Sequence, residues 1–162
     1  MKKDAIEAIQ SGLKGAFIHS NPLDIIEGLS PELAMKKVEG FNHSIWDLLH
    51  HTVIWQDIFI SNIKGQEISW DPKHNWPAMD DYKNEKNFDD LLSRFRSGIE
   101  ETNTLLEEKK LDFTRKQRLS SEADFELSTI KLFMTILQHL SYHIGQMAVI
   151  RKIVDNNWPK RE

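Results

Sequence analysis

The stretch from Glu126 to Val154 constrains the fold more than any other part of this 162-residue sequence. Its spacing predicts one long helix, and apolar residues occupy most of the circumference of that helix: Leu127, Ile130, Leu132, Phe133, Ile136, Leu137, Leu140, Ile144, Met147, Val149 and Ile150. A helix with so little polar surface has to be covered by other elements on most sides. The sequence therefore predicts an all-α protein with this helix central to the core.

Three further long segments, residues 4–18, 44–63 and 87–109, space their apolar residues as helices do. At the start of segment 44–63, Ser44 and Asp47 have the arrangement of a capping box, and Gly65 stands just beyond its expected end. Asn87 is the expected N-cap of segment 87–109. Ser30-Pro31 predicts an additional short helix through Val38.

Two connections are long for a compact domain, residues 66–86 and 111–124, and no segment has a convincing strand pattern. Four long amphipathic segments predict a four-helix bundle with long connections. The length suits one domain spanning residues 1–162.

Composition excludes several kinds of chemistry. The sequence has no Cys, so disulfides, thiolate metal sites and a cysteine nucleophile are impossible. Its net charge is −4 with both signs mixed, which argues against nucleic acid or an anionic membrane as a partner. No run approaches the ~18 apolar residues of a transmembrane helix. We expect a cytoplasmic protein that acts on a small molecule.

His139 and His143 lie four residues apart in the last predicted helix. Side chains at this spacing project from one face, and two imidazoles so placed can bind one metal ion. Because the sequence contains seven His, a chance pair at this spacing is common, and the interpretation needs a third ligand.

The second long helix offers His50 and His51 as third ligand. His50 shares its face with mostly polar residues, whereas His51 shares its face with Leu48, Trp55 and Ile58 and is the one expected to point inward. A single inward His is more often a core residue with a hydrogen-bond partner. Three inward His on two core helices favour a metal, because burying three imidazoles without a common partner costs too much desolvation.

The sequence His-Ser-Ile-Trp-Asp-Leu-Leu-His-His-Thr-Val-Ile-Trp-Gln at 43–56, with His139, His143 and the following Gly145-Gln146, resembles the DinB/YfiT-like superfamily. The resemblance implies a four-helix bundle whose core binds a divalent metal through three His. The family register, counted from the Ser of the first motif, also puts the third ligand at His51.

Three neutral imidazoles would leave an open coordination position, which can activate water or bind a thiol from solution. The resemblance implies the thiol, since some relatives transfer or use low-molecular-weight thiols such as bacillithiol or mycothiol. A metal-dependent hydrolase and a non-catalytic metal-binding or stress-response module are the alternatives, and a homodimer through helix faces suits each of them. Zinc, nickel, iron and copper all suit three imidazoles.

Several other side chains are candidates for supporting roles. Gln146, three residues after His143, is expected either to hold a ligand or water beside the metal or to be a plain core amide. Asp47 is expected to cap its helix, and Tyr142 to pack. His19, His43 and His74 are expected at the surface. The 66–86 connection, with Trp70 and Trp76, is expected over or beside the site; the alternatives are residues 23–42 as the wall and the Trp residues in a dimer contact.

Overall fold

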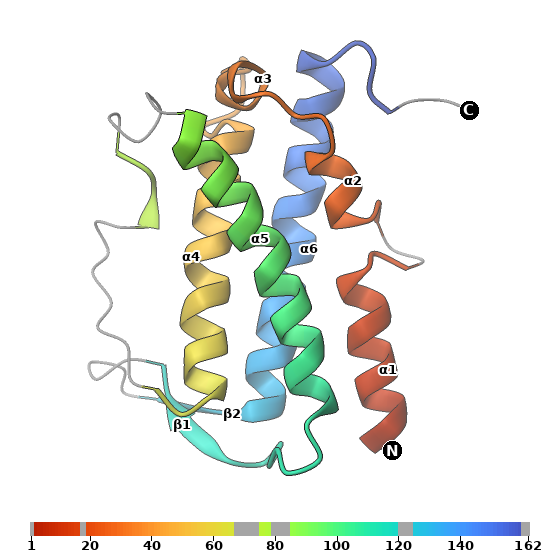
Figure 1. Cartoon of the computed structure of the whole chain (residues 1–162), viewed down its shortest axis with the longest axis vertical. Coiled ribbons are helices and arrows are strands. Elements are labelled where there is room, and N and C mark those ends of the chain that lie inside the picture. The colour runs from red at the N-terminus through yellow and green to blue at the C-terminus, as the bar shows by residue number, and fades with distance from the viewer. Residues whose placement is uncertain (1, 17–18, 67–74, 79–84, 120–124, 160–162) are drawn as a thin grey trace.

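A computed structural model describes residues 2–16, 19–66, 75–78, 85–119 and 125–159 of the chain. In these ranges it contains α1 (Lys2–Leu13), α2 (Pro22–Ile26), α3 (Pro31–Met35), α4 (Ile45–Ile63), α5 (Glu85–Glu107), β1 (Lys116–Arg118), β2 (Glu126–Ser128) and α6 (Thr129–Val154). Helix α4 packs against both α5 and α6, and α1 packs against α6 and α5 (Figure 1). The predicted all-α four-helix bundle is confirmed.

Helix α4, which carries His51, begins and ends where the sequence predicts. The backbone N–H of Ser44 donates to Asp47 Oδ2 at 2.7 Å, and the backbone N–H of Asp47 donates to Ser44 Oγ at 3.2 Å, so the capping box is complete. At the other end Gly65 has φ 80°, a left-handed conformation that other residues rarely adopt. Ser30 likewise caps α3 through Leu33 N–H, although that helix stops at Met35 rather than Val38.

Boundaries of two long helices also differ from the prediction. Helix α1 stops at Leu13, because Gly15 has φ 78° and turns the chain out of the helix. Helix α5 begins at Glu85, so Asn87 lies inside it instead of capping it. It ends at Glu107 rather than Lys109.

The expectation of no strand is also wrong. Glu126–Ser128, predicted as the start of the last helix, forms β2 and pairs antiparallel with β1 in a small hairpin. The hairpin completes hydrogen bonding at the start of α6, where the N–H groups of Thr129 and Ile130 donate to Arg115 O and Phe113 O. First-turn N–H groups have no partner within their own helix, so the connection supplies one.

Helix α6 contributes seven fully buried apolar side chains to the core: Leu132, Phe133, Ile136, Leu140, Ile144, Met147 and Ile150. It is less enclosed than its sequence predicts, however. Tyr142, Val149 and Ile153 are 64%, 48% and 52% exposed, so one face of α6 is apolar and uncovered by described residues. No helix in the described ranges is long and apolar enough to cross a membrane.

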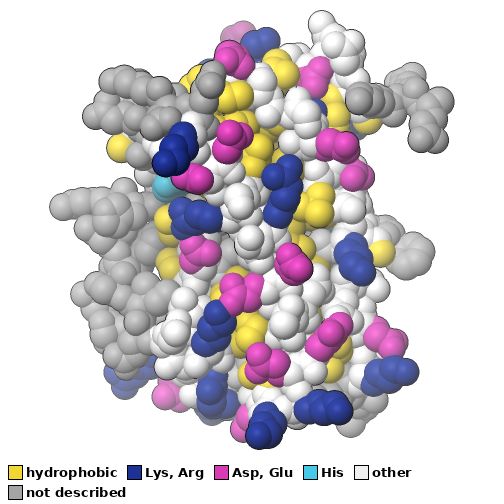
Figure 2. Space-filling model, in the orientation of Figure 1, with side chains coloured by type: hydrophobic (Ala, Val, Ile, Leu, Met, Phe, Trp, Pro, Cys, Tyr) yellow, Lys and Arg dark blue, Asp and Glu magenta, His cyan; other side chains and the backbone are white. Residues whose placement is uncertain are grey.

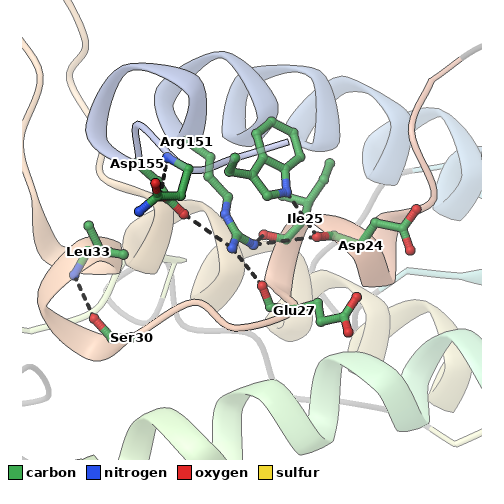
Figure 3. A network of polar contacts seen from close by, with 9 residues as sticks. Asp24, Ile25, Glu27, Ser30, Leu33, Arg151 and Asp155 are labelled. Carbon is green, nitrogen blue, oxygen red and sulfur yellow. Dashed lines mark hydrogen bonds and ion pairs between the residues drawn. The ribbon is translucent and has the colours of Figure 1, made fainter. Parts of the chain in front are cut away.

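The short helix α2 is attached to α6 by one buried arginine. The Arg151 guanidinium, 3% exposed, donates to the backbone carbonyls of Ile25 and Glu27, the latter at 2.6 Å (Figure 3). Its Nη2 also lies 3.5 Å from Oδ2 of Asp155, the C-cap residue of α6. Carbonyls at the end of a helix have no partner within it, and Arg151 supplies charged donors to them.

Charge on the face of the bundle that carries α5 is mixed in sign. Figure 2 shows basic and acidic side chains interspersed over this face, without a patch of a single sign. Two ion pairs in this region join neighbouring helices, Arg94 with Asp57 and Lys64 with Glu101.

Candidate metal centre

Three imidazoles from two helices meet in the bundle. His139 Nε2 lies 3.0 Å from His51 Nε2 and 3.2 Å from His143 Nε2. These three His form the group of possible metal ligands among the described residues, with their ligand atoms all within 4.8 Å of one another. Helix α4 supplies His51, and two turns of α6 supply the pair.

The rotation of α4 decides which of its two adjacent His joins this group. His51 is 8% exposed and faces α6, whereas His50 lines a cavity with Trp46 and Arg94 on the α5 side of the helix. Successive helix residues are ~100° apart around the axis, so only one of two neighbours can point at α6. The face predicted from the neighbours of His51 is the inward one.

Hydrogen bonds on the outer nitrogens fix the tautomers of two rings. His51 Nδ1 lies 3.2 Å from the backbone carbonyl oxygen of Asn75, and His143 Nδ1 lies 2.7 Å from Gln146 Oε1. Both oxygens accept, so both Nδ1 atoms carry hydrogen and both Nε2 atoms direct a lone pair inward. A neutral His139 can donate one hydrogen to only one of them, whereas a divalent cation between the three nitrogens would suit both close contacts.

The spacing also fits a metal. Ligand nitrogens ~2.1 Å from one tetrahedral ion lie about 3.4 Å apart. The two measured separations, 3.0 and 3.2 Å, are close to that value. The donor set and its geometry are thus compatible with a divalent cation held by the three Nε2 atoms.

A comparison with protein-family models matches residues 20–147 to the DinB superfamily. The chain belongs to the DinB superfamily. The matched segment includes the three His and Gln146, together with most of α6. A search of curated proteins finds no match.

Burial keeps the imidazoles of this DinB chain neutral, the form that binds metals. Desolvation lowers the pKa of His139 to about 3, with the neighbouring His143 and His51 adding repulsion. Desolvation lowers the pKa of His143 to about 4, although its hydrogen bond to Gln146 opposes the shift. Desolvation also lowers the pKa of His51, and the hydrogen bond between its ring and Asn75 opposes that shift. Acid that protonates these rings would release a metal.

Removal of metal should therefore leave a protein that acid destabilises. An unfolded imidazole takes up a proton near pH 6.5, whereas folded His139 and His143 do so only near pH 3 to 4. Between these values the unfolded state binds more protons, so the free energy of unfolding falls as the pH falls. Urea unfolding in chelator from pH 7.5 to 4.5 checks this. A double variant, His139→Ala with His143→Ala, should lose less stability over that range; an equal loss contradicts the prediction.

Aromatic rings surround the His cluster of this DinB bundle. Trp55 lies 6.3 Å from His51 and 6.2 Å from His139, and the Tyr142 ring lies 4.9 Å from His143. Trp76 stacks on His51 at 4.3 Å. The expectation that the 66–86 connection lies beside the site is thus confirmed for Asn75 and Trp76. Trp70 lies outside the described residues. The alternative wall, residues 23–42, packs through α2 and α3 on α6 and α4.

The remaining candidates have other roles or lie elsewhere. Asp47 caps α4 and pairs with Lys37. His19 bonds Ser141 Oγ at 3.0 Å, and His43 stacks on Trp76, so neither is a free surface His. His74 lies outside the described residues. Sequence reasoning missed the backbone carbonyl of Asn75, for which a sequence carries no signal, since every residue has one.

Proposed function

We propose that this chain is a metal-dependent enzyme that binds a divalent cation through His51, His139 and His143 and transfers an exogenous low-molecular-weight thiol to an electrophile. The convergence of the three Nε2 atoms carries the proposal. Three neutral protein ligands are typical of catalytic zinc sites, which keep a position open. When bound, such a cation supplies a Lewis-acid position that lowers the pKa of a thiol or of water.

The chain's own residues hold this ligand set in place. Gln146 and the Asn75 carbonyl accept from the outer nitrogens of His143 and His51, which orients both rings. The protein has no Cys, so a reacting thiol has to come from solution. Such thiols are kept reduced in the cytoplasm, the compartment we propose for the reaction.

The composition of the ligand group favours a thiol over water as the nucleophile. Helical zinc hydrolases use a Glu beside the ligands as general base. The described groups in contact with these three imidazoles are Asn75, Gln146 and aromatic rings, with no carboxylate among them. A thiol is acidic enough to ionise at a metal without that base, so the metal-dependent hydrolase is the second candidate.

A thiol-transfer assay tests the proposal. Zinc-loaded protein is mixed with bacillithiol or cysteine and monochlorobimane, and fluorescence follows thioether formation. The thiol proton goes to solvent, the sulfur–carbon bond forms and chloride leaves. We expect a metal-dependent rate above that of thiol alone, lost in His139→Ala. Equal rates for the two proteins contradict transferase activity; ester hydrolysis without thiol then indicates the hydrolase, and inactivity in both assays the non-catalytic module.

We further propose a homodimer through the exposed face of α6. Tyr142, Val149 and Ile153 share this face, and Gly145 between them has open space where a Cβ would lie. The missing side chain at the edge of this face allows a second helix to approach closely. Val149→Glu should shift the sedimentation coefficient from dimer to monomer, whereas Arg96→Glu, exposed on α5, should not. A wild-type protein that sediments as a monomer contradicts the proposal.

A further inference from the structure

Asn75 and Trp76, here called the clasp, are bound to α4 beside His51 although they belong to the connection that follows that helix. The backbone carbonyl of Asn75 accepts from His51 Nδ1 at 3.2 Å. Its side-chain Oδ1 accepts from Trp55 Nε1, one turn further along α4, at 2.9 Å. Both oxygens of one residue are therefore engaged by one face of α4. In Figure 1 this segment (yellow-green) lies alongside the helix.

Trp76 stacks on two imidazoles. Its ring is nearly parallel to that of His51, at 4.3 Å and 11°, and to that of His43, at 3.7 Å and 4°. His43 stands just before the Ser44 cap, so the capping box of α4 sets the position of its ring and supports Trp76. The stack on Trp76 limits rotation of the His51 ring about its side-chain bonds.

These contacts control the two properties that make His51 a ligand. The Asn75 carbonyl holds hydrogen on Nδ1, which leaves the Nε2 lone pair for a metal. Trp76 holds the plane of the ring. An imidazole bound to a divalent cation is electron-poor, and the electron-rich face of an indole attracts it more strongly than it attracts a neutral ring. The stack should therefore be tighter when the metal is bound.

We infer that Asn75 and Trp76 are positioning residues for His51, and that docking of the clasp and binding of a divalent metal at the three His stabilise each other. The inference rests on the proposed metal site and adds a ligand-orienting role for a segment outside the bundle helices. By linkage, the metal should stabilise the docked clasp by the same factor that the docked clasp strengthens metal binding.

Cobalt binding to the full chain tests the clasp. Co²⁺ is titrated against a competing chelator, and its visible absorption bands report the ligand geometry. Trp76→Leu should weaken Co²⁺ binding about tenfold, within the ~10–100-fold range for residues that orient metal ligands, and should alter the bands. Trp76→Phe keeps a stacking ring and should restore most of both. Phe125→Leu, an exposed aromatic beside β2, is the matched control and should change neither.

Two further measurements keep the test decisive if Trp76→Leu does not fold. Trp55→Phe removes the donor to Asn75 Oδ1 while keeping an aromatic ring beside His51 and His139, and it should weaken Co²⁺ binding severalfold. In the wild type, zinc should slow exchange of the backbone amide hydrogens of Asn75, Trp76 and Ala78, and His51→Ala should abolish that effect. If the wild type binds Co²⁺ normally and the clasp variants show the same affinity and the same absorption bands, the positioning role of the clasp is contradicted and the metal site is not. A wild type that binds no Co²⁺ overturns the metal site, and the clasp as a ligand-positioning device with it.

Discussion

His139→Ala is expected to abolish retention of a divalent metal while leaving the helical bundle folded. His139 Nε2 is the nitrogen close to both of the others, so its loss leaves two ligands from different helices. Losing a residue that merely orients a ligand costs ~10–100-fold in affinity, so losing a ligand should cost more than about 100-fold. Metal content after gel filtration, measured beside far-ultraviolet circular dichroism, checks both parts.

The matched control for this variant is His19→Ala. His19 also contacts α6, through Ser141 Oγ, but stands outside the cluster of three. It should retain metal as the wild type does. Loss of helicity in His139→Ala, or on chelation of the wild type, would instead indicate a metal that holds the fold together, as in zinc fingers, and would favour the non-catalytic alternative.

Arg151→Met is expected to cause a large loss of stability. The variant keeps an apolar stem but removes the donors to the carbonyls of Ile25 and Glu27 and the partner of Asp155. Removing one partner from a buried charged network costs about 3–5 kcal/mol, because the groups left behind are buried without partners. For a chain of this size that corresponds to a melting temperature lower by roughly 6–20 °C. Urea and thermal unfolding in chelator measure it.

Lys152→Met is the matched control, since Lys152 is the next residue of α6 and is exposed. Its effect should stay within ~0.5 kcal/mol, as for most surface substitutions. The metal affinity of Arg151→Met should change little at temperatures where it is folded, because its contacts are with α2 and with Asp155 rather than with the His cluster. A melting temperature equal to that of Lys152→Met contradicts the role assigned to Arg151.

Features that depend on a few neighbouring residues were predictable. The bounds of α4 follow from the Ser44–Asp47 capping box and from Gly65, each of which acts within one helical turn. The inward rotation of His51 follows from the apolar residues that share its face. The family register agrees with it, because the same helix has to present the same face to the core.

Features that depend on contacts between segments distant in the sequence were not predictable. The residues of β1 and β2 have no alternating pattern, and they form strands because their backbone pairs across the connection and supplies partners to the start of α6. From the sequence alone, Arg151 in the last helix would be assigned to the surface because it is charged. Only the fold places the terminal carbonyls of α2 against its guanidinium. Gly15 shortens α1 through a left-handed turn that its apolar spacing does not reveal.

The sequence by itself determined the helical class, the α4 and α6 faces that meet, and the three imidazoles those faces carry, because helical periodicity converts spacing directly into direction. The tertiary structure decided how the imidazoles are held. Asn75 reaches His51 from 24 positions away, through a backbone carbonyl that every residue has, and Trp76 stacks on a ring that no local pattern pairs with it. Such contacts arise only when the connection returns along α4, and the path of a chain between helices is set by the packing of the whole bundle.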